Sequence, residues 1–300
     1  MAPEATAAGL HIRDLTVRIP VSRHAVVHAV TELTLRVPRG TVTALVGESG
    51  CGKSVVATTV LGQLPEQAWV TGSVEAVLDD RALDVLTTSM PLRGRHIGFV
   101  PQSPATHFTP VRTIGAQLDE TIRVLGAYRT RVEVAARAGL AAEALDRYPH
   151  ELSSGMAQRA AIAAALIGDP EILIADEPTS SLDRERTDDI FALLRASADT
   201  GTAVLLITHD LAALERTSVA DTVAVMYASR LMEVGPNHDV LHNPWHRYTR
   251  DLLAALPERG LTPIPRTSPE LTNLSPDCPY AGGPSALVPR AGRLVRERRP

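Results

Sequence analysis

The octapeptide GESGCGKS, residues 47–54, has the residue types and the spacing to bind a chain of phosphates. Four residues separate Gly47 from Gly52, and Lys53 and Ser54 follow directly, which is the P-loop pattern. In that pattern backbone N–H groups surround the phosphates, the lysine reaches the β- and γ-phosphates, and the hydroxyl ligates Mg²⁺. Lys53 is the only lysine among the thirty Lys and Arg residues, and its compact ammonium group fits a narrow backbone cradle that a planar guanidinium cannot enter. The predicted nucleotide-binding residues of this loop are Gly47, Glu48, Ser49, Gly50, Cys51, Gly52, Lys53 and Ser54.

A pair of adjacent acids, Asp176 and Glu177, ends the apolar run ILIAD. In α/β sheets the carboxyl ends of the strands are where ligand groups are presented. We therefore predict that Asp176 binds Mg²⁺, directly or through water, and that Glu177 activates the attacking water as a general base. The alternative is a solvated pair of acids at the end of a strand.

Two more polar residues, Gln102 and His209, follow the strand-like runs RHIGFVP and TAVLLIT. A histidine after a strand is more often a surface or capping residue than a catalytic one. Both residues are nevertheless expected at the sheet edge that carries the phosphates. We predict that Gln102 contacts Mg²⁺ or the attacking water, and that His209 senses the γ-phosphate.

The stretch LSSGMAQRAAIAAAL contains a second candidate anion site. Ser153, Ser154 and Gly155 open an alanine-rich helix, so their backbone N–H groups and hydroxyls are available to an anion. A plain helix N-cap would account for the same residues. One nucleotide does not require two such sites in one subunit, whereas a dimer in which each subunit covers the nucleotide of the other does.

The elements that must position these residues follow an α/β order. An apolar run at 41–46 precedes the glycine-rich loop and a helical pattern follows it at 54–64, which favours a true P-loop over a chance glycine-rich turn. Residues 10–37 alternate between polar and apolar types, as antiparallel strands with one solvated face do. Residues 111–147 have apolar spacings of three and four, which predict helices. The predicted fold is an α/β P-loop nucleoside triphosphatase with a RecA-like core, an antiparallel β subdomain and an all-helical insert at about 103–170.

The composition is that of a globular chain of 300 residues with 44% hydrophobic residues. A net charge of −4 and a pI near 6.2 indicate no overall basic face, so we expect no nucleic-acid partner. Two cysteines exclude a disulfide scaffold and suit a reducing compartment. No apolar run approaches the roughly 18 residues that cross a bilayer, and the first residues lack a secretory signal. The chain is expected in the cytosol or bound to a membrane through a partner.

The composition changes after Pro257. Residues 258–300 are rich in proline and arginine and poor in large apolar side chains, so they cannot bury a core of their own. We expect an ATPase domain over 1–257 and a C-terminal tail over 258–300 that is extended or partly disordered.

The ordered motifs GESGCGKS, FVPQ, LSSGMAQR, ILIADEPTSSLD and LLITHD give the chain a family resemblance. Over roughly Leu10 to Leu256 it resembles the ATPase subunits of ABC transporters. The resemblance implies the following roles: Walker A for Gly47–Ser54, Q-loop for Gln102, signature for Ser153–Met156, Walker B and catalytic glutamate for Asp176 and Glu177, D-loop for Ser180–Asp183, and switch histidine for His209. It adds Met156 and Asp183 to the predicted nucleotide contacts, and His24 as the ring nearest the position of the family's adenine-stacking aromatic.

A finer resemblance is to the dipeptide, oligopeptide and nickel importer branch, through ELSSGMAQRA, TPVRTIGAQLDE and EVGPNHDVLHNPWHRYTRDLLAALP. It implies an ATP- and Mg²⁺-dependent ATPase, peripheral to the cytoplasmic face of the membrane, that energises uptake of peptides or nickel and other metal chelates. The implied partners are a second ABC ATPase in a hetero- or homodimer, two transmembrane permease subunits and an extracytoplasmic substrate-binding protein. Two alternatives are a soluble ABC ATPase acting on ribosomes or DNA and an exporter subunit. The single P-loop and the lack of heptads disfavour the first, and the family-like C-terminal segment disfavours the second.

The chain departs from the family pattern in four places. Ser154 replaces the second glycine of the signature and adds a Cβ where the backbone approaches phosphate, which is expected to slow the site that it completes. His24 is a weak substitute for the stacking aromatic, and the insert near AYRTRVEVAARAGL is shorter than usual. Relatives carry a Cys-rich motif suited to an iron–sulfur cluster, which commonly requires four thiolates. Only Cys278 remains here, so we expect no cluster.

Overall fold

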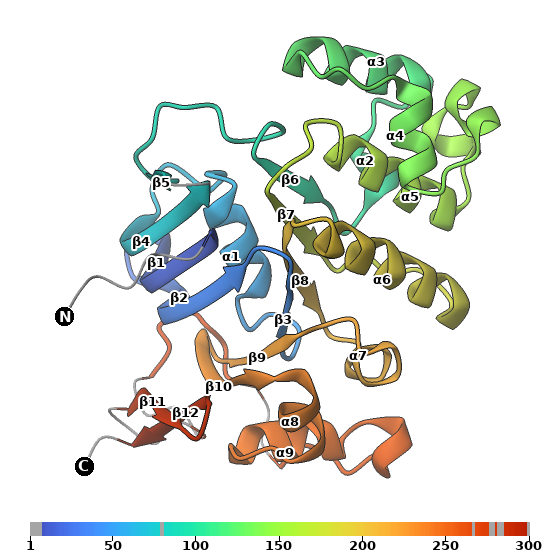
Figure 1. Ribbon diagram of the computed structural model, residues 1–300. Coiled ribbons are helices and arrows are strands. Elements are labelled where there is room, and N and C mark those ends of the chain that lie inside the picture. Colours follow the sequence, from blue (N-terminus) through green and yellow to red (C-terminus); the bar gives the residue numbers. More distant parts are fainter. Residues whose placement is uncertain (1–7, 79–80, 266–267, 276–279, 281–284, 299–300) are drawn as a thin grey trace.

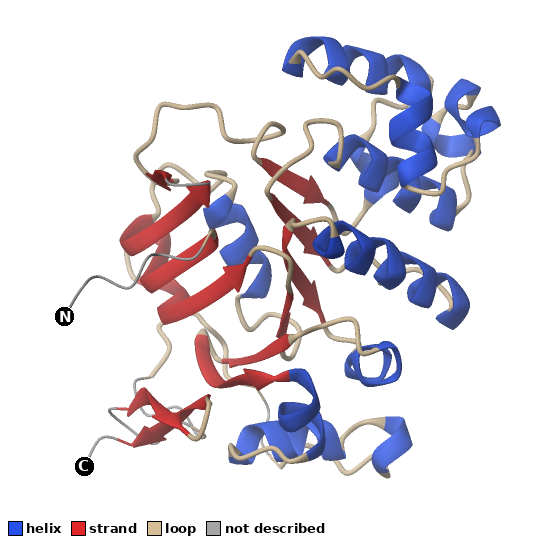
Figure 2. Ribbon diagram, viewed as in Figure 1, coloured by secondary structure: helices blue, strands red, loops and turns tan. Residues whose placement is uncertain are grey.

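The computed structural model describes residues 8–78, 81–265, 268–275, 280 and 285–298, and these form two β-sheets with helices packed against them (Figure 1 and Figure 2). The smaller sheet has four antiparallel strands in the order β2-β1-β4-β5. Its strands are β1 (Gly9–Ser22), β2 (Ala25–Pro38), β4 (Trp69–Leu78) and β5 (Arg81–Asp84). The antiparallel pair predicted over residues 10–37 is therefore confirmed as β1 and β2.

The larger sheet has eight strands in the order β11-β12-β10-β9-β3-β8-β7-β6, and the strands from β9 to β6 are parallel. Its strands are β3 (Val42–Val46), β6 (Ile97–Val100), β7 (Ile172–Asp176), β8 (Ala203–Thr208), β9 (Thr222–Tyr227), β10 (Arg230–Pro236), β11 (Ser285–Arg290) and β12 (Arg293–Arg298). Every residue of β3, β7 and β8 is buried, as continuous apolar runs are when both faces of a parallel sheet are covered. The candidate site lies at the carboxyl ends of these three strands.

Two hydrophobic clusters cover the two faces of the larger sheet. In β3, Ala44 and Val46 belong to the cluster that includes α6 (Arg184–Asp199) and α7 (Leu211–Thr217), whereas Leu45 belongs to the cluster shared with the smaller sheet and α1 (Lys53–Val60). The side chains alternate because successive residues of a strand point to opposite faces. Helix α1 is therefore enclosed between the two sheets (Figure 1).

Every regular element between residues 103 and 170 is helical, and these helices lie together beyond the β6 edge of the sheet (Figure 2). They are α2 (Pro104–His107), α3 (Ile114–Leu125), α4 (Arg131–Arg137), α5 (Ser154–Ala165) and the 3₁₀ turns Ala142–Asp146 and Pro149–Glu151. Near the end of the insert, the carboxylate of Asp169 accepts hydrogen bonds from Tyr128, Arg129 and Arg137, which links the α3–α4 part of the insert to the segment that leads into β7. The predicted fold class is confirmed.

The C-terminal region packs beside β10. It comprises α8 (Asn237–His242), α9 (Arg247–Ala254), the 3₁₀ turn Pro257–Arg259 and the hairpin β11–β12, which extends the larger sheet through pairing of β12 with β10. The expectation of an extended or partly disordered tail is wrong for residues 285–298. Cys278, the residue on which the expectation of no iron–sulfur cluster depends, lies outside the described residues.

The hairpin is ordered because it uses a core that already exists. Arg296 is buried and its guanidinium donates to the carbonyl oxygens of Leu231 and Ser285, while the Arg293 guanidinium lies 4.4 Å from the ring centre of Trp245. A segment without a core of its own can thus add strands to a sheet edge and bury arginines against backbone carbonyls. Within the described residues, no helix has the length and hydropathy to span a membrane.

Candidate nucleotide site

The loop between β3 and α1 has a backbone that requires its glycines. Gly47 has a φ of 152° and Gly52 a φ of 109°, and a Cβ on either residue would stand 2.1 Å from a backbone oxygen, that of Met226 or Ala29. Side chains at these two positions are therefore excluded both by conformation and by space. Helix α1 begins at Lys53 with no side-chain cap on Gly52, which leaves its first N–H groups to serve an anion.

The Lys53 side chain folds back over the loop. Its residue is only 6% exposed, and Nζ donates to the carbonyl oxygens of Gly47 and Glu48 at 2.8 and 2.9 Å. The ammonium group is therefore held beside the glycine cradle by neutral acceptors, and its charge remains available to phosphate oxygens. This arrangement fits the predicted binding of a phosphate chain.

Ser54 and Asp176 are brought together from opposite parts of the sequence. The Ser54 hydroxyl donates to Oδ1 of Asp176 at 3.2 Å, because α1 starts next to the end of β7. Burial raises the pKa of Asp176 above its ordinary value, the hydrogen bond from Ser54 opposes that shift, and the charge of Glu177 adds to it. A buried carboxylate next to a second acid is a place where a cation would be stabilised.

Glu177 and His209 meet at the ends of the neighbouring strands β7 and β8. Nδ1 of His209 lies 2.6 Å from Oε2 of Glu177, and because an ionised carboxylate only accepts, this contact selects the tautomer with hydrogen on Nδ1. Glu177 itself is 8% exposed, has a φ of 48° and donates its backbone N–H to Ile207. The left-handed backbone conformation turns its side chain at the strand end, where strained residues often serve function.

Gln102 and His24 are both exposed. Gln102 is in the loop that follows β6, and His24 is in the turn between β1 and β2. Their predicted contacts with Mg²⁺ and with adenine stay predictions.

The signature residues stand at the start of α5. The Ser153 hydroxyl accepts from the backbone N–H of Met156 at 3.3 Å, Ser154 is exposed, and Gly155 and Met156 are half-buried. Helix α5 contributes to the cluster on one face of the larger sheet, and α1 contributes to the cluster on the other face. The signature and the P-loop of one chain therefore belong to different layers.

Asp183 caps α6. Its carboxylate accepts from the backbone N–H of Arg186 at 2.9 Å and pairs with the guanidinium of the same residue at 3.3 Å. Arg186 also passes close to Gly155 of the signature, since a Cβ on that glycine would stand 3.3 Å from the arginine side chain. The D-loop and the signature are thus adjacent.

One set of contacts at this site was missed by sequence reasoning. The carboxylate of Glu48 accepts from the hydroxyls of Tyr248 and Ser268, which lie 200 and 220 residues further along the chain. No local pattern reports a contact of that range. Taken together, the fold and the site define a P-loop nucleoside triphosphatase.

Comparisons with known sequences give the family. The ABC transporter family model matches residues 30–180, and the model of the oligopeptide/dipeptide transporter C-terminal region matches residues 232–282. The dipeptide transport ATP-binding protein DppD of Bacillus subtilis is 38% identical over 271 residues, which are 85% of this chain and 80% of that protein. The probable D,D-dipeptide transport ATP-binding protein DdpD of Escherichia coli is also 38% identical over 271 residues, 85% of this chain and 82% of that protein.

A longer relative and a solved structure extend the comparison. The oligopeptide transport ATP-binding protein OppD of Mycobacterium tuberculosis is 39% identical over 292 residues, which are 91% of this chain and 47% of that protein. The dimeric structure of MJ0796, a bacterial ABC transporter cassette, matches with a TM-score of 0.65 at 22% sequence identity. The match covers 76% of this chain and 98% of the MJ0796 chain. That likeness supports the fold. The chain belongs to the ABC transporter family as an ATP-binding ATPase, which confirms the resemblance inferred from its motifs.

Proposed function

We propose that the chain hydrolyses ATP with Mg²⁺ as a peripheral subunit, on the cytoplasmic face of the membrane, of an importer of peptides. The observation that carries the proposal is the meeting of Ser54 with Asp176 and of Glu177 with His209 at one edge of the sheet, beside the P-loop. Relatives named as dipeptide and oligopeptide transport ATP-binding proteins favour peptides over nickel or other metal chelates as the cargo. The match of the C-terminal region to that transporter family disfavours an exporter or a ribosome-directed ATPase.

The proposed chemistry divides the site between binding and hydrolysis. The P-loop N–H groups and Lys53 would bind the phosphates, and Ser54 and Asp176 would hold Mg²⁺, which neutralises phosphate charge when bound. Glu177 would accept a proton from the attacking water, and the hydrogen bond from His209 would orient the Glu177 carboxylate. Burial raises the pKa of Asp176 and so disfavours its ionised form. A bound cation would offset that cost, which supports a cation at this position.

A second ABC ATPase is the first proposed partner. Ser153, Ser154 and Gly155 offer N–H groups and hydroxyls at the start of α5, a helix of 12 residues. Their own P-loop is in a different layer of the same chain, so we propose that they cover the nucleotide of the partner ATPase. The partner is either another copy of this chain or a related chain.

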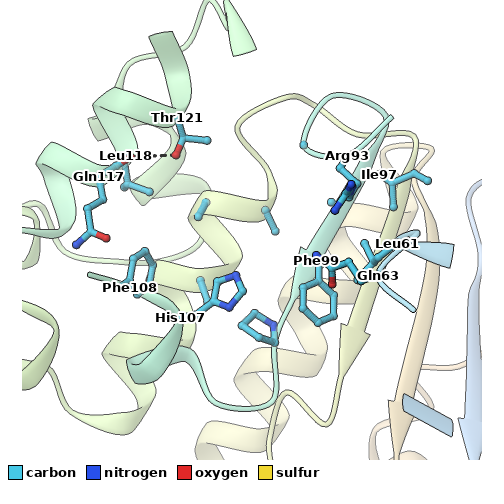
Figure 3. A pocket seen from close by; sticks show the side chains of 16 residues that line it. Leu61, Gln63, Arg93, Ile97, Phe99, His107, Phe108, Gln117, Leu118 and Thr121 are labelled. Atoms are coloured by element: carbon cyan, nitrogen blue, oxygen red, sulfur yellow. Dashed lines mark hydrogen bonds between the residues drawn. The ribbon is translucent and has the colours of Figure 1, made fainter. Parts of the chain in front are cut away.

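A membrane subunit is the second proposed partner. A cavity of about 320 Å³ opens between β6 and the helical insert, lined mostly by apolar side chains (Figure 3). Phe99 stands on the β6 side and Phe108 and Leu118 on the side of the insert, and Pro101, next to Gln102, is part of the lining. We propose that a short helix of a permease subunit occupies this groove, because a ligand there contacts both the insert and the loop of Gln102. Two permeases and an extracytoplasmic binding protein complete the proposed importer.

The proposal is tested by reconstitution. The chain is co-expressed with the candidate permeases and partner ATPase, and uptake of radiolabelled dipeptides and of ⁶³Ni²⁺ is measured in vesicles with ATP inside or outside. ATP-dependent dipeptide uptake that disappears in Glu177→Gln supports the proposal. Uptake of nickel alone would reassign the cargo, and ATP hydrolysis without any association with permeases would contradict the transport role.

A further inference from the structure

The C-terminal region contacts the P-loop through one carboxylate. The phenol of Tyr248, in α9, donates to Oε1 of Glu48 at 2.9 Å, and the hydroxyl of Ser268 donates to Oε2 at 2.6 Å. Both oxygens of Glu48 are therefore engaged by groups from beyond the ATPase motifs. Tyr248 is fully buried, and burial raises the pKa of its phenol, so it stays protonated and acts as a donor.

The same residue is linked to Lys53. The backbone oxygen of Glu48 accepts from Nζ of Lys53 at 2.9 Å, while its side chain is held by Tyr248 and Ser268. If these hydroxyls released the Glu48 carboxylate, its side chain could turn toward the phosphates. Its negative charge would then compete for Lys53 and repel phosphate. The two hydroxyls therefore fix both the position of the loop and the direction of its one acidic side chain.

Residues 268–273, here called the C-terminal strap, continue from Glu48 to the turn that carries His24. The side chain of Asn273 accepts from the backbone N–H of Val26 at 3.0 Å and donates to the carbonyl oxygen of His24 at 2.9 Å. The backbone N–H of Asn273 donates to the oxygen of Val26, and that of His28 to the oxygen of Leu271. The strap thus pairs with the start of β2, an edge strand of the smaller sheet.

The packing around Tyr248 gives this connection a rigid base. Its ring lies 4.4 Å from the ring of Tyr227, the last residue of β9, and Tyr280 packs on both at 5.1 and 5.2 Å between ring centres. The residue before Tyr227, Met226, supplies the backbone oxygen that excludes a side chain at Gly47. The phenol that binds Glu48 is therefore fixed against the strand that supports the P-loop.

We propose that Tyr248, Ser268 and Asn273 are positioning residues of the nucleotide site, and that docking of the C-terminal strap and binding of nucleotide stabilise each other. The inference deepens the proposed function and rests on it, because it takes the phosphates of the nucleotide to lie at Lys53 and the adenine base at His24. The strap holds these two ends at a fixed separation. By linkage, any gain in nucleotide affinity from the docked strap is matched by an equal stabilisation of the strap by nucleotide.

The test uses the full chain and a fluorescent ATP analogue. Tyr248→Phe removes the phenol that binds Glu48, and Tyr128→Phe is the matched control, because it removes a phenol–carboxylate bond to Asp169 in the helical insert. Tyr248→Phe is expected to weaken nucleotide binding about fivefold, the scale of one hydrogen bond, while Tyr128→Phe leaves it unchanged. Ser268→Ala, at an exposed position, gives a smaller loss in the same direction and is no risk to folding.

A second measurement separates positioning from general destabilisation. If Tyr248 acts through Glu48, then Tyr248→Phe has no further effect on affinity in a Glu48→Ala background, whereas independent effects would add. Nucleotide should also slow proteolytic cleavage within 258–275 in the wild-type chain, and less so in Asn273→Ala. Equal affinities for Tyr248→Phe and Tyr128→Phe, or additive effects with Glu48→Ala, would overturn the inference. A wild-type chain that binds no nucleotide would instead overturn the proposed function.

Discussion

The nucleotide site and the contact of the C-terminal hairpin with β10 both bury charged groups, and they differ in what those groups bind. The second region, here called the junction, is formed by Glu233 of β10 and Arg293 of β12. At the junction, Glu233 is fully buried, and its two oxygens accept from the backbone N–H groups of Trp245 and His246, with Arg293 at 3.5 Å. At the site, Asp176 is 7% exposed and receives a hydrogen bond from the neutral hydroxyl of Ser54. The first carboxylate forms an ion pair with a cation of the chain. Asp176 receives the charge of Lys53, which favours its ionised form, without an ion pair among the described residues.

Lys53 extends the same contrast to positive charge. Its ammonium group donates to two neutral carbonyl oxygens, whereas the guanidinium of Arg293 has both Glu233 and Asp239 as acidic neighbours. A buried charge is stable when protein groups compensate it. Where they do not, the site has capacity for a charged ligand. This difference supports the proposed binding of phosphate and a cation at the nucleotide site, whereas the charges of the junction stabilise the fold.

The largest effect is expected from Glu177→Gln, which tests the catalytic side of the contrast. Removing the general base should lower the rate of ATP hydrolysis about a thousandfold, while ATP stays bound and a closed dimer accumulates. Phosphate release and size-exclusion chromatography with Mg²⁺ and ATP measure both results. The matched control is Glu171→Gln. Glu171 pairs with Nδ1 of His96 at 3.1 Å and lies just before the start of β7, whereas the site lies at the end of that strand. Turnover at the wild-type rate in Glu177→Gln would contradict the assignment.

Lys53 separates charge from shape. Lys53→Ala should lower nucleotide affinity about a hundredfold, the scale of losing hydrogen bonds to a charged group. Lys53→Arg keeps the charge, yet the planar guanidinium does not fit a cradle in which Gly47 and Gly52 already exclude a Cβ. We therefore expect weak binding in both variants, measured by fluorescence titration. Full affinity in Lys53→Arg would show that charge alone is sufficient.

Substitutions at the junction should change the stability of the fold. Arg293→Ala leaves Glu233 without its cation and is expected to lower the free energy of unfolding by about 3 kcal/mol, measured by denaturant titration. Arg290→Ala is the matched control, since Arg290 forms an exposed ion pair with Glu297 of the same hairpin, and its removal should leave stability nearly unchanged.

A double variant sharpens that prediction. Glu233→Gln with Arg293→Met removes both charges and keeps similar volumes, so it should be more stable than Arg293→Ala alone. A double variant less stable than either single change would mean that the ion pair itself, and not an uncompensated charge, governs the stability of the junction.

How well each region can be predicted from the sequence depends on how far apart its interacting residues lie along the chain. Asp176 and Glu177 are adjacent, and the P-loop is one continuous stretch between a strand and a helix, so local spacing is sufficient to predict them as candidates. The meeting of Ser54 with Asp176 and of Glu177 with His209 follows once the strands are placed in one parallel sheet, because their carboxyl ends share an edge.

The C-terminal contacts could not be predicted in this way. Residues 285–298 contain only the short apolar runs ALV and LV among arginines and a proline. What orders them is the edge of β10, which pairs with β12 and lies more than fifty residues before it in the chain. The same holds for Tyr248, whose hydroxyl reaches a P-loop residue 200 positions away. Composition describes what a segment can bury alone, and these segments are stabilised by surfaces that other parts of the chain provide.

The smallest effect is expected at Ser154, where the site depends on a partner chain. Ser154 is exposed at the start of α5, and its Cβ is proposed to face the nucleotide of the second ATPase. Ser154→Gly should raise turnover of the assembled complex by about threefold, much less than the loss of a whole preorganised donor would change it. The affinity of the isolated subunit for ATP should not change, because α5 and α1 lie in different layers. Ser218→Gly is the matched control, since Ser218 is exposed at the end of α7 with a φ of 50°, a conformation that glycine accepts. An altered affinity in the isolated Ser154→Gly subunit would mean that the signature serves its own P-loop, and the two-subunit arrangement would then be wrong.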